Sequence, residues 1–390
     1  MSKWKTVKLE DTCALNMGQS PASSSYNKEK KGIPFFQGNA DFGPLHPVTR
    51  FYCSEPTKIA HTNDILLSVR APIGAVNIAE EDCCIGRGLA GLTPHTDVSL
   101  KYLYYVLLGK NDELNFKGTG CTFKAINKKS LGETSFPLPP LKEQKRIADI
   151  LDKAAELISL RKQQIEKLDL LVKSKFIDMF GDPVTNPKGW NVRRIFEVVH
   201  SDKNALKAGP FGSSLKKEFY VRSGFKIYGQ EQVISGNPSF GDYYIDERKY
   251  NELQSCSVKE GDVLISLVGT YGKLLIIPHD FEPGIINPRL MKISFDLTLV
   301  NVVYFKCFFM TESLMFFLKG QTHGGTMGIL NLGIVKNIKL PVPPLPLQTE
   351  FATFVKKVEE QKSQMQTGLE KLELNYKALM VEFFEGESEI

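Results

Sequence analysis

The feature that most constrains the fold is an internal repeat with a spacing of about 204 residues. The segment Phe-Pro-Leu-Pro-Pro-Leu at residues 136–141 matches Leu-Pro-Val-Pro-Pro-Leu at residues 340–345, and 340 − 136 = 204. Residues 122–127 match residues 326–331 at the same spacing. A repeat of this length is typical of duplicated modules, so we expect the 390-residue chain to fold as two related halves.

Each copy ends in a segment that is predicted to form a long helix. From about Lys142 to Phe180, apolar residues recur every three or four positions, and no Pro or Gly interrupts them before Gly181. From about Gln348 to Phe384, apolar residues recur every seven positions, which is the coiled-coil period. We expect the two helices to pack antiparallel on one another. The residues predicted to form this contact are Ile158, Ile165, Leu168, Val172, Val358, Met365, Leu372 and Leu379.

The segment that precedes each helix is expected to be a globular α+β domain. Residues 63–68 and 261–266 match at a spacing of 198 and contain apolar runs typical of buried strands. Residues 102–108 and 302–318 are expected to be helical. The predicted fold class is therefore α+β, with two sheet-containing domains separated by two long helices in a pseudo-two-fold repeat. The predicted boundaries are 1–141, 142–182, 183–346 and 347–390.

Composition and charge limit the class of protein. The chain is 42% hydrophobic and 24% charged, no stretch approaches the ~20 consecutive apolar residues of a membrane span, and the first residues lack the apolar core of a signal peptide. We therefore expect a cytoplasmic protein. Counted along the sequence, the net charge is +3 over residues 1–140, +4 over residues 181–345 and −4 over residues 346–390. Mildly basic modules can contact phosphates, but tight binding through charge needs a stronger patch or a partner that adds charge.

The cysteines and histidines lack the spacing of a metal site. The seven cysteines include no Cys-x-x-Cys pair, and the adjacent Cys83 and Cys84 suit neither a disulfide nor two ligands of one metal. The six histidines show no His-x-x-x-His spacing. We expect free thiols in a reducing compartment, and no metal bound by this chain.

Motifs that would indicate catalysis are weak. Residues 116–120, Phe-Lys-Gly-Thr-Gly, fit a pattern with which methyltransferases hold their methyl donor, but the polar residues 111–115 before them predict a loop rather than the required strand. Residues 246–249 are acidic enough to suggest a metal-dependent nuclease, but they are more typical of a solvated turn. The P-loop pattern and the Gly-x-Ser-x-Gly pattern are both absent from the sequence. We therefore expect no catalysis by this chain alone.

The entries to the two helices resemble a known family. Residues 137–152, Pro-Leu-Pro-Pro-Leu-Lys-Glu-Gln-Lys-Arg-Ile-Ala-Asp-Ile-Leu-Asp, together with Met-Phe-Gly-Asp at 179–182, resemble the conserved-region signature of type I restriction-modification specificity subunits. The second copy, at residues 343–348, keeps Pro-Pro-Leu and a Gln but lacks the Glu. Segments similar to the target-recognition domains of that family lie at residues 33–39, 84–88, 209–213 and 261–266. The resemblance covers essentially the whole chain.

The resemblance implies a role in DNA recognition. Such a subunit carries two target-recognition domains, each of which reads one half of a split site in double-stranded DNA. Its helices form a spacer and bind two methyltransferase subunits, which use S-adenosylmethionine, while motor-nuclease subunits bound through them use ATP and Mg. The chain itself would then bind no cofactor and would be a non-catalytic subunit. The residues alone leave open two other interpretations: an interaction scaffold that binds no nucleic acid, and a fused endonuclease or methyltransferase.

The residues most suited to contact bases lie in the predicted loops. Arg or Lys favours guanine, and Asn or Gln favours adenine. The candidates in the first half are Gln37, Asn39, Arg70, Arg87 and Lys124. The candidates in the second half are Ser213, Lys216, Gln230, Gln232, Tyr271, Lys273, Asn287 and Arg289.

Overall fold

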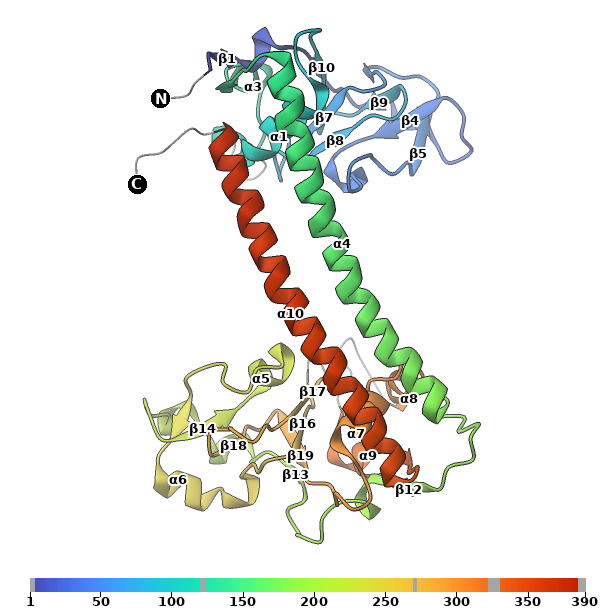
Figure 1. Cartoon of the computed structure of the whole chain (residues 1–390), viewed down its shortest axis with the longest axis vertical. Helices are drawn as coiled ribbons and strands as arrows, with labels where there is room; N and C mark the ends of the chain where they lie inside the picture. The colour runs from blue at the N-terminus through green and yellow to red at the C-terminus, as the bar shows by residue number, and fades with distance from the viewer. Residues whose placement is uncertain (1–3, 120–123, 269–271, 322–329, 385–390) are drawn as a thin grey trace. The chain divides into compact units, whose positions relative to one another are not determined.

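The computed structural model shows two compact units that share the long helices (Figure 1). Unit 1 contains residues 1–163 and 366–390, and unit 2 contains residues 164–365. The residues that the structure describes are 4–119, 124–268, 272–321 and 330–384. The repeat match predicted at residues 122–127 and 326–331 therefore lies mostly outside the described residues.

Unit 1 is an α+β domain built on two main sheets. Its strands are β1 (Thr6–Lys8), β2 (Cys13–Met17), β3 (Tyr26–Asn27), β4 (Ile33–Phe36), β5 (Phe51–Cys53), β6 (Ile59–Ala60), β7 (Ile65–Ser68), β8 (Val76–Ile78), β9 (Cys83–Ile85), β10 (Leu89–Pro94) and β11 (Ser135–Pro137). Its short helices are α1 (Leu100–Gly109), α2 (Asn111–Lys117) and α3 (Lys128–Gly132). One sheet has the antiparallel order β2-β10-β7-β8, and the other has the order β3-β5-β4-β9-β6, in which β4 and β9 are parallel.

Unit 2 repeats this frame. Its strands are β12 (Val192–Arg194), β13 (Leu206–Ala208), β14 (Phe225–Tyr228), β15 (Tyr244–Ile245), β16 (Val263–Ser266), β17 (Leu274–Ile276), β18 (Gly284–Ile286), β19 (Leu290–Ile293) and β20 (Lys339–Pro341). Its short helices are α5 (Gln230–Ser235), α6 (Glu247–Glu252), α7 (Val302–Phe309), α8 (Glu312–Gln321) and α9 (Leu332–Lys336). The order β13-β19-β16-β17 matches β2-β10-β7-β8, and the parallel pair β14–β18 matches β4–β9. The predicted repeat is thus a repeat of topology, and the predicted α+β class is confirmed.

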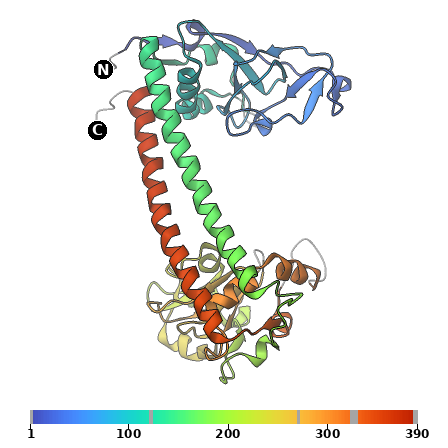
Figure 2. The same ribbon diagram turned by 45° about the vertical axis from the view of Figure 1, so that its right-hand side comes forward.

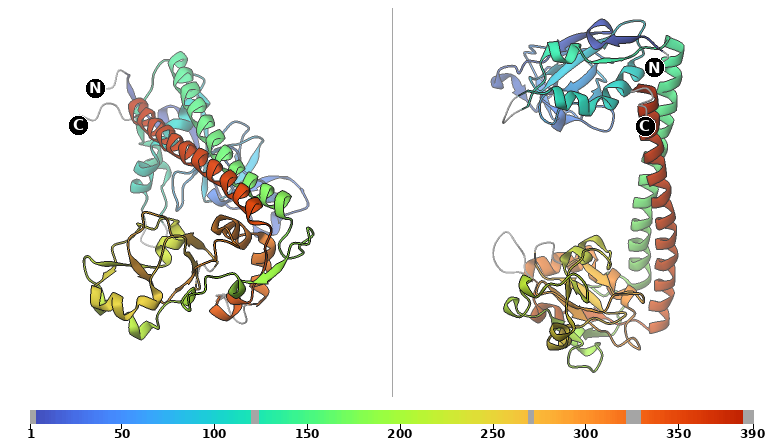
Figure 3. Two further views of the ribbon diagram at one scale, coloured as in Figure 1. Left: turned by 60° about the horizontal axis from the view of Figure 1, so that its bottom comes forward. Right: turned by 90° about the vertical axis from the view of Figure 1, so that its left-hand side faces the viewer.

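The two long helices are α4 (Leu141–Phe180) and α10 (Leu345–Phe384), of 40 residues each. They run side by side in all views (Figures 2 and 3). The Nζ of Lys162 lies 2.7 Å from Glu373, and Lys362 pairs with Asp169. Because the partner number falls as the position on α4 rises, the helices are antiparallel, as predicted. Both begin directly after a Pro-Pro pair, because proline ends the preceding strand and suits the first turn of a helix.

The residues predicted to pack between the two long helices are buried to different degrees. Val358 is buried, at 5% exposure. Val172 packs against the core of unit 2, and Leu379 packs against the core of unit 1. The remaining residues are half-buried, namely Ile158, Ile165, Leu168, Met365 and Leu372. The middle of the helix pair therefore buries less apolar surface than its two ends.

A buried glutamine holds the start of α4 to the rest of unit 1. Gln144 is 1% exposed, and its side-chain Nε2 donates to the carbonyl oxygens of Asp97 (3.0 Å) and Pro139 (2.9 Å). Its Oε1 accepts from the main-chain N–H of Ser99 at 2.8 Å. One amide thus joins the first turn of α4, the segment before it and the start of α1.

Gln348 repeats this arrangement in unit 2, 204 residues later. Its Nε2 donates to the carbonyl oxygens of Leu299 (3.0 Å) and Pro343 (2.7 Å), and its Oε1 accepts from the N–H of Asn301 (2.8 Å). The glutamine that both copies of the sequence signature retain therefore has the same structural role in both units.

A buried tyrosine supports the same junction from the short helix. The hydroxyl of Tyr102 in α1 donates to the carbonyl of Pro137, and the hydroxyl of Tyr304 in α7 donates to the carbonyl of Pro341 at 2.8 Å. The spacing of this pair is 202, so α1 and α7 are equivalent helices. Aromatic residues from the ends of the long helices close both cores: Phe383 and Phe384 in unit 1, and Phe176 and Phe180 in unit 2.

Three local expectations from the sequence were wrong. Residues 111–115 form part of helix α2 rather than a loop, because Glu113 bonds Lys110 and Lys117 one turn away on either side. Residues 246–249 are not a simple turn, since the carboxylate of Asp246 caps α6 by accepting from the N–H of Lys249 at 2.7 Å. The helix expected over residues 302–318 is interrupted at residues 310–311, between α7 and α8.

Two further expectations concern metals and membranes. The six described cysteines, namely Cys13, Cys53, Cys83, Cys84, Cys256 and Cys307, are free thiols, as predicted. Among the described residues, no group of three or more His, Cys, Asp or Glu is arranged to hold a metal ion. Within the same part of the chain, none of the helices has the length and apolar character required to span a bilayer.

The buried glutamines should be worth a measurable share of the stability. We expect Gln144→Leu to lower the free energy of unfolding by about 1–3 kcal/mol, because three buried main-chain groups lose their partner. The exposed Gln163 on the same helix provides the matched control Gln163→Leu. Urea denaturation of the full chain measures both, and an equal loss in the two variants would contradict a structural role for Gln144.

Candidate nucleic-acid interface

Four of the five candidate residues of unit 1 gather where its central strands end. Gln37 follows β4, Arg87 follows β9 and Arg70 lies two residues beyond β7. Because β4 and β9 are parallel, their carboxyl ends meet at one edge. The side chains of these three residues are exposed, as is that of Lys124.

Main-chain contacts connect these loops in series. The N–H of Gly86 donates to the carbonyl of Phe36 at 2.8 Å, and the N–H of Val69 donates to the carbonyl of Gly88 at 2.9 Å. The N–H of Ala71 donates to the carbonyl of Lys124 at 3.1 Å. The structure thus assembles Gln37, Arg70, Arg87 and Lys124 into one surface, although they are up to 87 residues apart in the sequence. Asn39 is half-buried and begins the short turn Asn39–Asp41 beside it.

The corresponding surface of unit 2 carries a bonded cluster of side chains. Arg289 Nη1 donates to Gln230 Oε1 at 3.3 Å, and Gln230 Nε2 donates to Ser266 Oγ at 2.8 Å. Asn287 Oδ1 accepts from the main-chain N–H of Arg289 at 2.9 Å. These residues come from the ends of the strands β14, β16 and β18, which match β4, β7 and β9 of unit 1. An exposed guanidinium held by an amide can donate to base or phosphate oxygens without much further ordering.

The other candidates of unit 2 are placed less uniformly. Lys273 is exposed, and its carbonyl accepts from the N–H of Ser266 at 2.9 Å, so it borders the cluster. Ser213 and Lys216 are exposed in the loop that follows β13. Tyr271 lies outside the described residues.

Gln232 requires a correction. Its side chain is 2% exposed, its Oε1 accepts from the N–H of Gly229 at 2.8 Å, and its Nε2 donates to the carbonyl of Phe240 at 2.5 Å. Both ends of the amide are therefore used inside the domain, and the surface that a base could reach does not include it. Gln232 is a structural residue, which the loop-based prediction could not distinguish from an exposed one.

Two glycines at equivalent positions allow the loops to approach closely. A Cβ on Gly18 would lie 2.2 Å from the carbonyl oxygen of Gly86, and a Cβ on Gly209 would lie 1.9 Å from that of Asn287. Each glycine also makes an equivalent main-chain hydrogen bond. Gly18 N–H donates to the Leu89 carbonyl at 2.9 Å, and Gly209 N–H donates to the Leu290 carbonyl at 2.8 Å. The loops that carry Arg87 and Arg289 are thus set by contacts that only glycine permits.

Three strongly exposed aromatic residues are not among the residues predicted from the sequence to contact DNA. Phe211, in the loop after Gly209, is 87% exposed. Phe116 in α2 is 89% exposed and Phe316 in α8 is 80% exposed. These two residues are 200 positions apart in the sequence, which is also the spacing between the last residues of α1 and α7, Gly109 and Phe309. Aromatic side chains beside cationic ones are common on protein surfaces that bind nucleic acids. One of them, Phe116, is the first residue of the Phe-Lys-Gly-Thr-Gly segment.

Comparison with known proteins identifies the family of this fold. The family model described as the type I restriction modification DNA specificity domain matches residues 1–170 and again residues 187–374. The two matches correspond to the two copies of the structural repeat, each with its module and most of the long helix that follows.

Individual relatives agree with this assignment. The putative type I restriction enzyme MjaX specificity subunit of Methanocaldococcus jannaschii is 44% identical over 169 residues, which are 43% of this chain and 40% of that protein. The MjaIX specificity subunit of the same organism is 27% identical over 76% of this chain and 71% of its own length. The crystal structure of the type I restriction-modification system S subunit from M. genitalium has the same fold, with a TM-score of 0.58 at 17% identity over 98% of this chain and 96% of that one.

The close loop contacts in unit 1 can be tested with alanine. We expect Gly18→Ala to lower the free energy of unfolding by about 1–3 kcal/mol, because the new methyl group overlaps the Gly86 carbonyl and cannot be relieved by a side-chain rotation. Gly38→Ala is the control, since a Cβ there meets nothing within 4 Å. Thermal or urea unfolding measures both, and equal stabilities would show that the loops are not closely packed.

Proposed function

This chain belongs to the family of type I restriction-modification DNA specificity proteins, and we propose that it is the non-catalytic, DNA-reading subunit of such a system. Each unit reads one half of a split site in double-stranded DNA. The long helices bind two methyltransferase subunits, which carry S-adenosylmethionine, and the motor-nuclease subunits with ATP and Mg join through them. The chain itself supplies recognition and no cofactor.

One observation carries the proposal. Both units present side chains suited to base contacts at the same place in the same frame, where the paired strands β4 and β9, or β14 and β18, end. Arg70, Arg87 and Lys124 in unit 1 and Lys273 and Arg289 in unit 2 are exposed there. Two equivalent but chemically different surfaces are what recognition of two different half-sites requires.

The modest charge of the modules supports the need for partners. Over residues 1–140 and 181–345 the net charges are only +3 and +4. Neutralisation of phosphates supplies much of the affinity of DNA-binding proteins. A chain with so few excess cations is therefore expected to bind DNA weakly alone and tightly once the methyltransferase subunits surround the duplex.

The cluster of unit 2 provides the direct test of DNA contact. We expect Arg289→Ala to raise the Kd of the assembled methyltransferase complex for its DNA by about 5- to 150-fold, which corresponds to a lost base contact of ~1–3 kcal/mol. Arg248→Ala is the matched control. Arg248 is exposed in the same unit, on α6. The segment before α6 packs against Gly224, which precedes β14, and so lies at the end of β14 opposite to Gln230.

Fluorescence anisotropy at one fixed salt concentration compares the two variants, because affinity for DNA depends steeply on salt. A similar loss in both would mean that Arg289 acts only through overall charge. No measurable binding of DNA by the wild-type complex would favour the alternative of an interaction scaffold.

Exchange of a module tests the division of labour. We expect replacement of residues 1–136 by the matching module of a relative to change one half of the methylated sequence and to leave the other half intact. The exchange keeps both long helices, and each module has its own core. Methylome sequencing of cells that carry either version gives the sites directly. A simultaneous change of both half-sites would contradict separate reading by the two units.

A further inference from the structure

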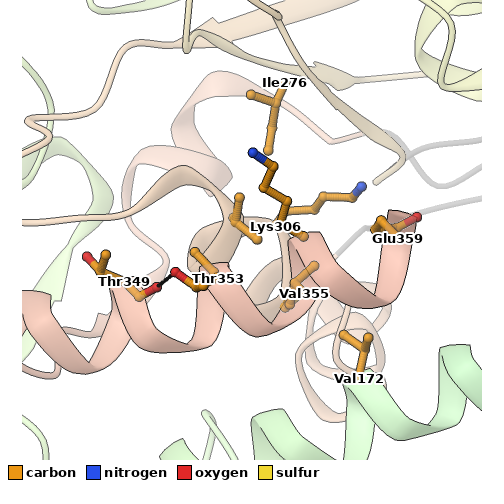
Figure 4. Close-up of a pocket in the computed structure, with 11 residues that line it drawn as sticks. Val172, Ile276, Lys306, Thr349, Thr353, Val355 and Glu359 are labelled. Atoms are coloured by element: carbon orange, nitrogen blue, oxygen red, sulfur yellow. Dashed lines mark hydrogen bonds between the residues drawn. The ribbon is translucent and has the colours of Figure 1, made fainter. Parts of the chain in front are cut away.

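Unit 2 contains an apolar groove. The groove has a volume of about 460 Å³ and lies between α7 and α10, beside β17. Figure 4 shows its walls, which include Ile276 from β17, Val355 from α10 and Val172 from α4. Cys307 from α7 and Ala352 from α10 also line it. All of these residues belong to unit 2.

The repeat shows what covers the same face in unit 1. At the spacing of 202 that relates α1 to α7, Cys307 corresponds to Tyr105 and Lys306 to Tyr104. At the spacing of 204 that relates α4 to α10, Val172 corresponds to Tyr376. In unit 1 the positions equivalent to Lys306, Cys307 and Val172 therefore all carry tyrosine rings. Tyr104 and Tyr105 pack edge to face with their centroids 5.3 Å apart, and both are buried.

The polar groups at this face also differ between the units. In unit 1, Asp152 of α4 accepts from the hydroxyl of Tyr105 at 2.7 Å and pairs with Lys101. The position equivalent to Asp152 in unit 2 is Lys356, which lines the groove together with Lys306. Unit 1 thus supplies a carboxylate of its own beside the rings, whereas unit 2 presents two ammonium groups. Glu359, farther along α10, is the acidic residue of the groove lining.

The thiol in the groove is neutral at physiological pH. Burial raises the pKa of the Cys307 thiol to about 11, so the thiol stays protonated. In unit 1, burial raises the pKa of the Tyr376 phenol to about 12. The apolar groove of unit 2 is open to solvent, so it lacks the free energy of burial that stabilises the tyrosines of unit 1.

We propose that the groove receives an aromatic side chain, with a carboxylate beside it, from the methyltransferase subunit that docks on unit 2. This inference rests on the proposed function. Unit 1 provides the same two chemical groups itself, so the two docking faces of the chain are not equivalent. The incoming ring contacts Val172, Ile276 and Val355, and the incoming carboxylate pairs with Lys306 and Lys356.

Other occupants fit the observations less well. A second copy of this chain could offer its most exposed rings, Phe116, Phe211 or Phe316. No acidic residue lies within four positions of Phe211, and the glutamates one turn before Phe116 and Phe316 already pair with lysines of their own chain. DNA could bring phosphates to Lys306 and Lys356, but its backbone has no apolar group to fill the wall formed by Val172, Ile276 and Val355. A protein segment with an exposed aromatic residue and an acidic neighbour has neither difficulty.

The test restores in unit 2 the side chain that unit 1 has. Val172→Tyr places a ring in the groove, and Leu171→Tyr is the matched control, because Leu171 is the neighbouring residue on α4 and is 47% exposed outside the groove lining. Native mass spectrometry and titration of the full chain with its methyltransferase subunit measure the stoichiometry and affinity. We expect the wild type and Leu171→Tyr to bind two subunits. We expect Val172→Tyr to bind the second at least about tenfold more weakly, as when an interface anchor is excluded.

A charge variant tests the second half of the proposal. Lys356→Glu leaves the groove open and reverses the charge beside it, so we expect weaker binding of the same subunit and no change in the other. Full affinity of Lys356→Glu would overturn the partner carboxylate. Full affinity of Val172→Tyr, with a normal melting temperature, would overturn the aromatic occupant.

The thiol in the groove gives a readout that needs no change to the groove itself. In a Cys121→Ser background, because Cys121 lies outside the described residues, we expect methanethiosulfonate to modify Cys307 slowly in the free chain, through its small thiolate fraction, and to be blocked in the complex with two methyltransferase subunits. Unchanged modification in that complex would overturn the proposal even if Val172→Tyr did not fold. A dimer of the chain alone that Val172→Tyr abolishes would identify a second copy as the occupant. Failure of the wild type to bind any methyltransferase subunit would refute the proposed function instead.

Discussion

The side-chain amides of Gln144 and Gln348 connect the three parts on which each unit is built: a short helix, the proline-rich segment and the first turn of a long helix. Each amide uses both hydrogens of its nitrogen and its oxygen, and all the groups it binds are main-chain groups. Main-chain groups stay in place when the surrounding side chains change. The junction can therefore hold the direction of each long helix while the rest of the module diverges, and the loops at the strand ends are free to vary in sequence.

The divergence of the two modules is visible in how each stabilises its loops. Lys226 of β14 is 1% exposed, and its Nζ binds Glu282 at 2.6 Å and the carbonyls of Ser239 and Gly241 at 3.3 and 3.2 Å. This bond holds the pKa of the Glu282 carboxyl below its usual value. In unit 1 the comparable loop after β4 is held by Asp41, which accepts from the N–H of Gln37 and binds Arg50. Different polar networks thus support equivalent loops.

The repeat, the long helices and the two sheet-containing modules could be predicted because they depend on periodic or duplicated patterns that extend over many residues. The contacts of single polar residues could not, since they depend on neighbours that are distant in the sequence. Gln232 had the composition of a base-contacting loop residue but is buried under Phe240 and Gly229. Helix α2 depends on ion pairs that outweigh its polar composition. The structural role of Gln144 could not be predicted either, because two of its main-chain partners, at Asp97 and Ser99, are distant from it in the sequence.

The division of the chain into units has a consequence for its synthesis on the ribosome. Unit 2 consists of the continuous segment 164–365, whereas unit 1 needs residues 366–390 in addition to residues 1–163. Phe383 and Phe384, which belong to the unit 1 core, are synthesised only after the whole of unit 2. The module that is translated first is therefore the last to complete its core, and until then it exposes the apolar side of α1. Gly109 at the end of that helix, which lies close to Met380 and Phe384 in the folded chain, gains these neighbours only once α10 has been made.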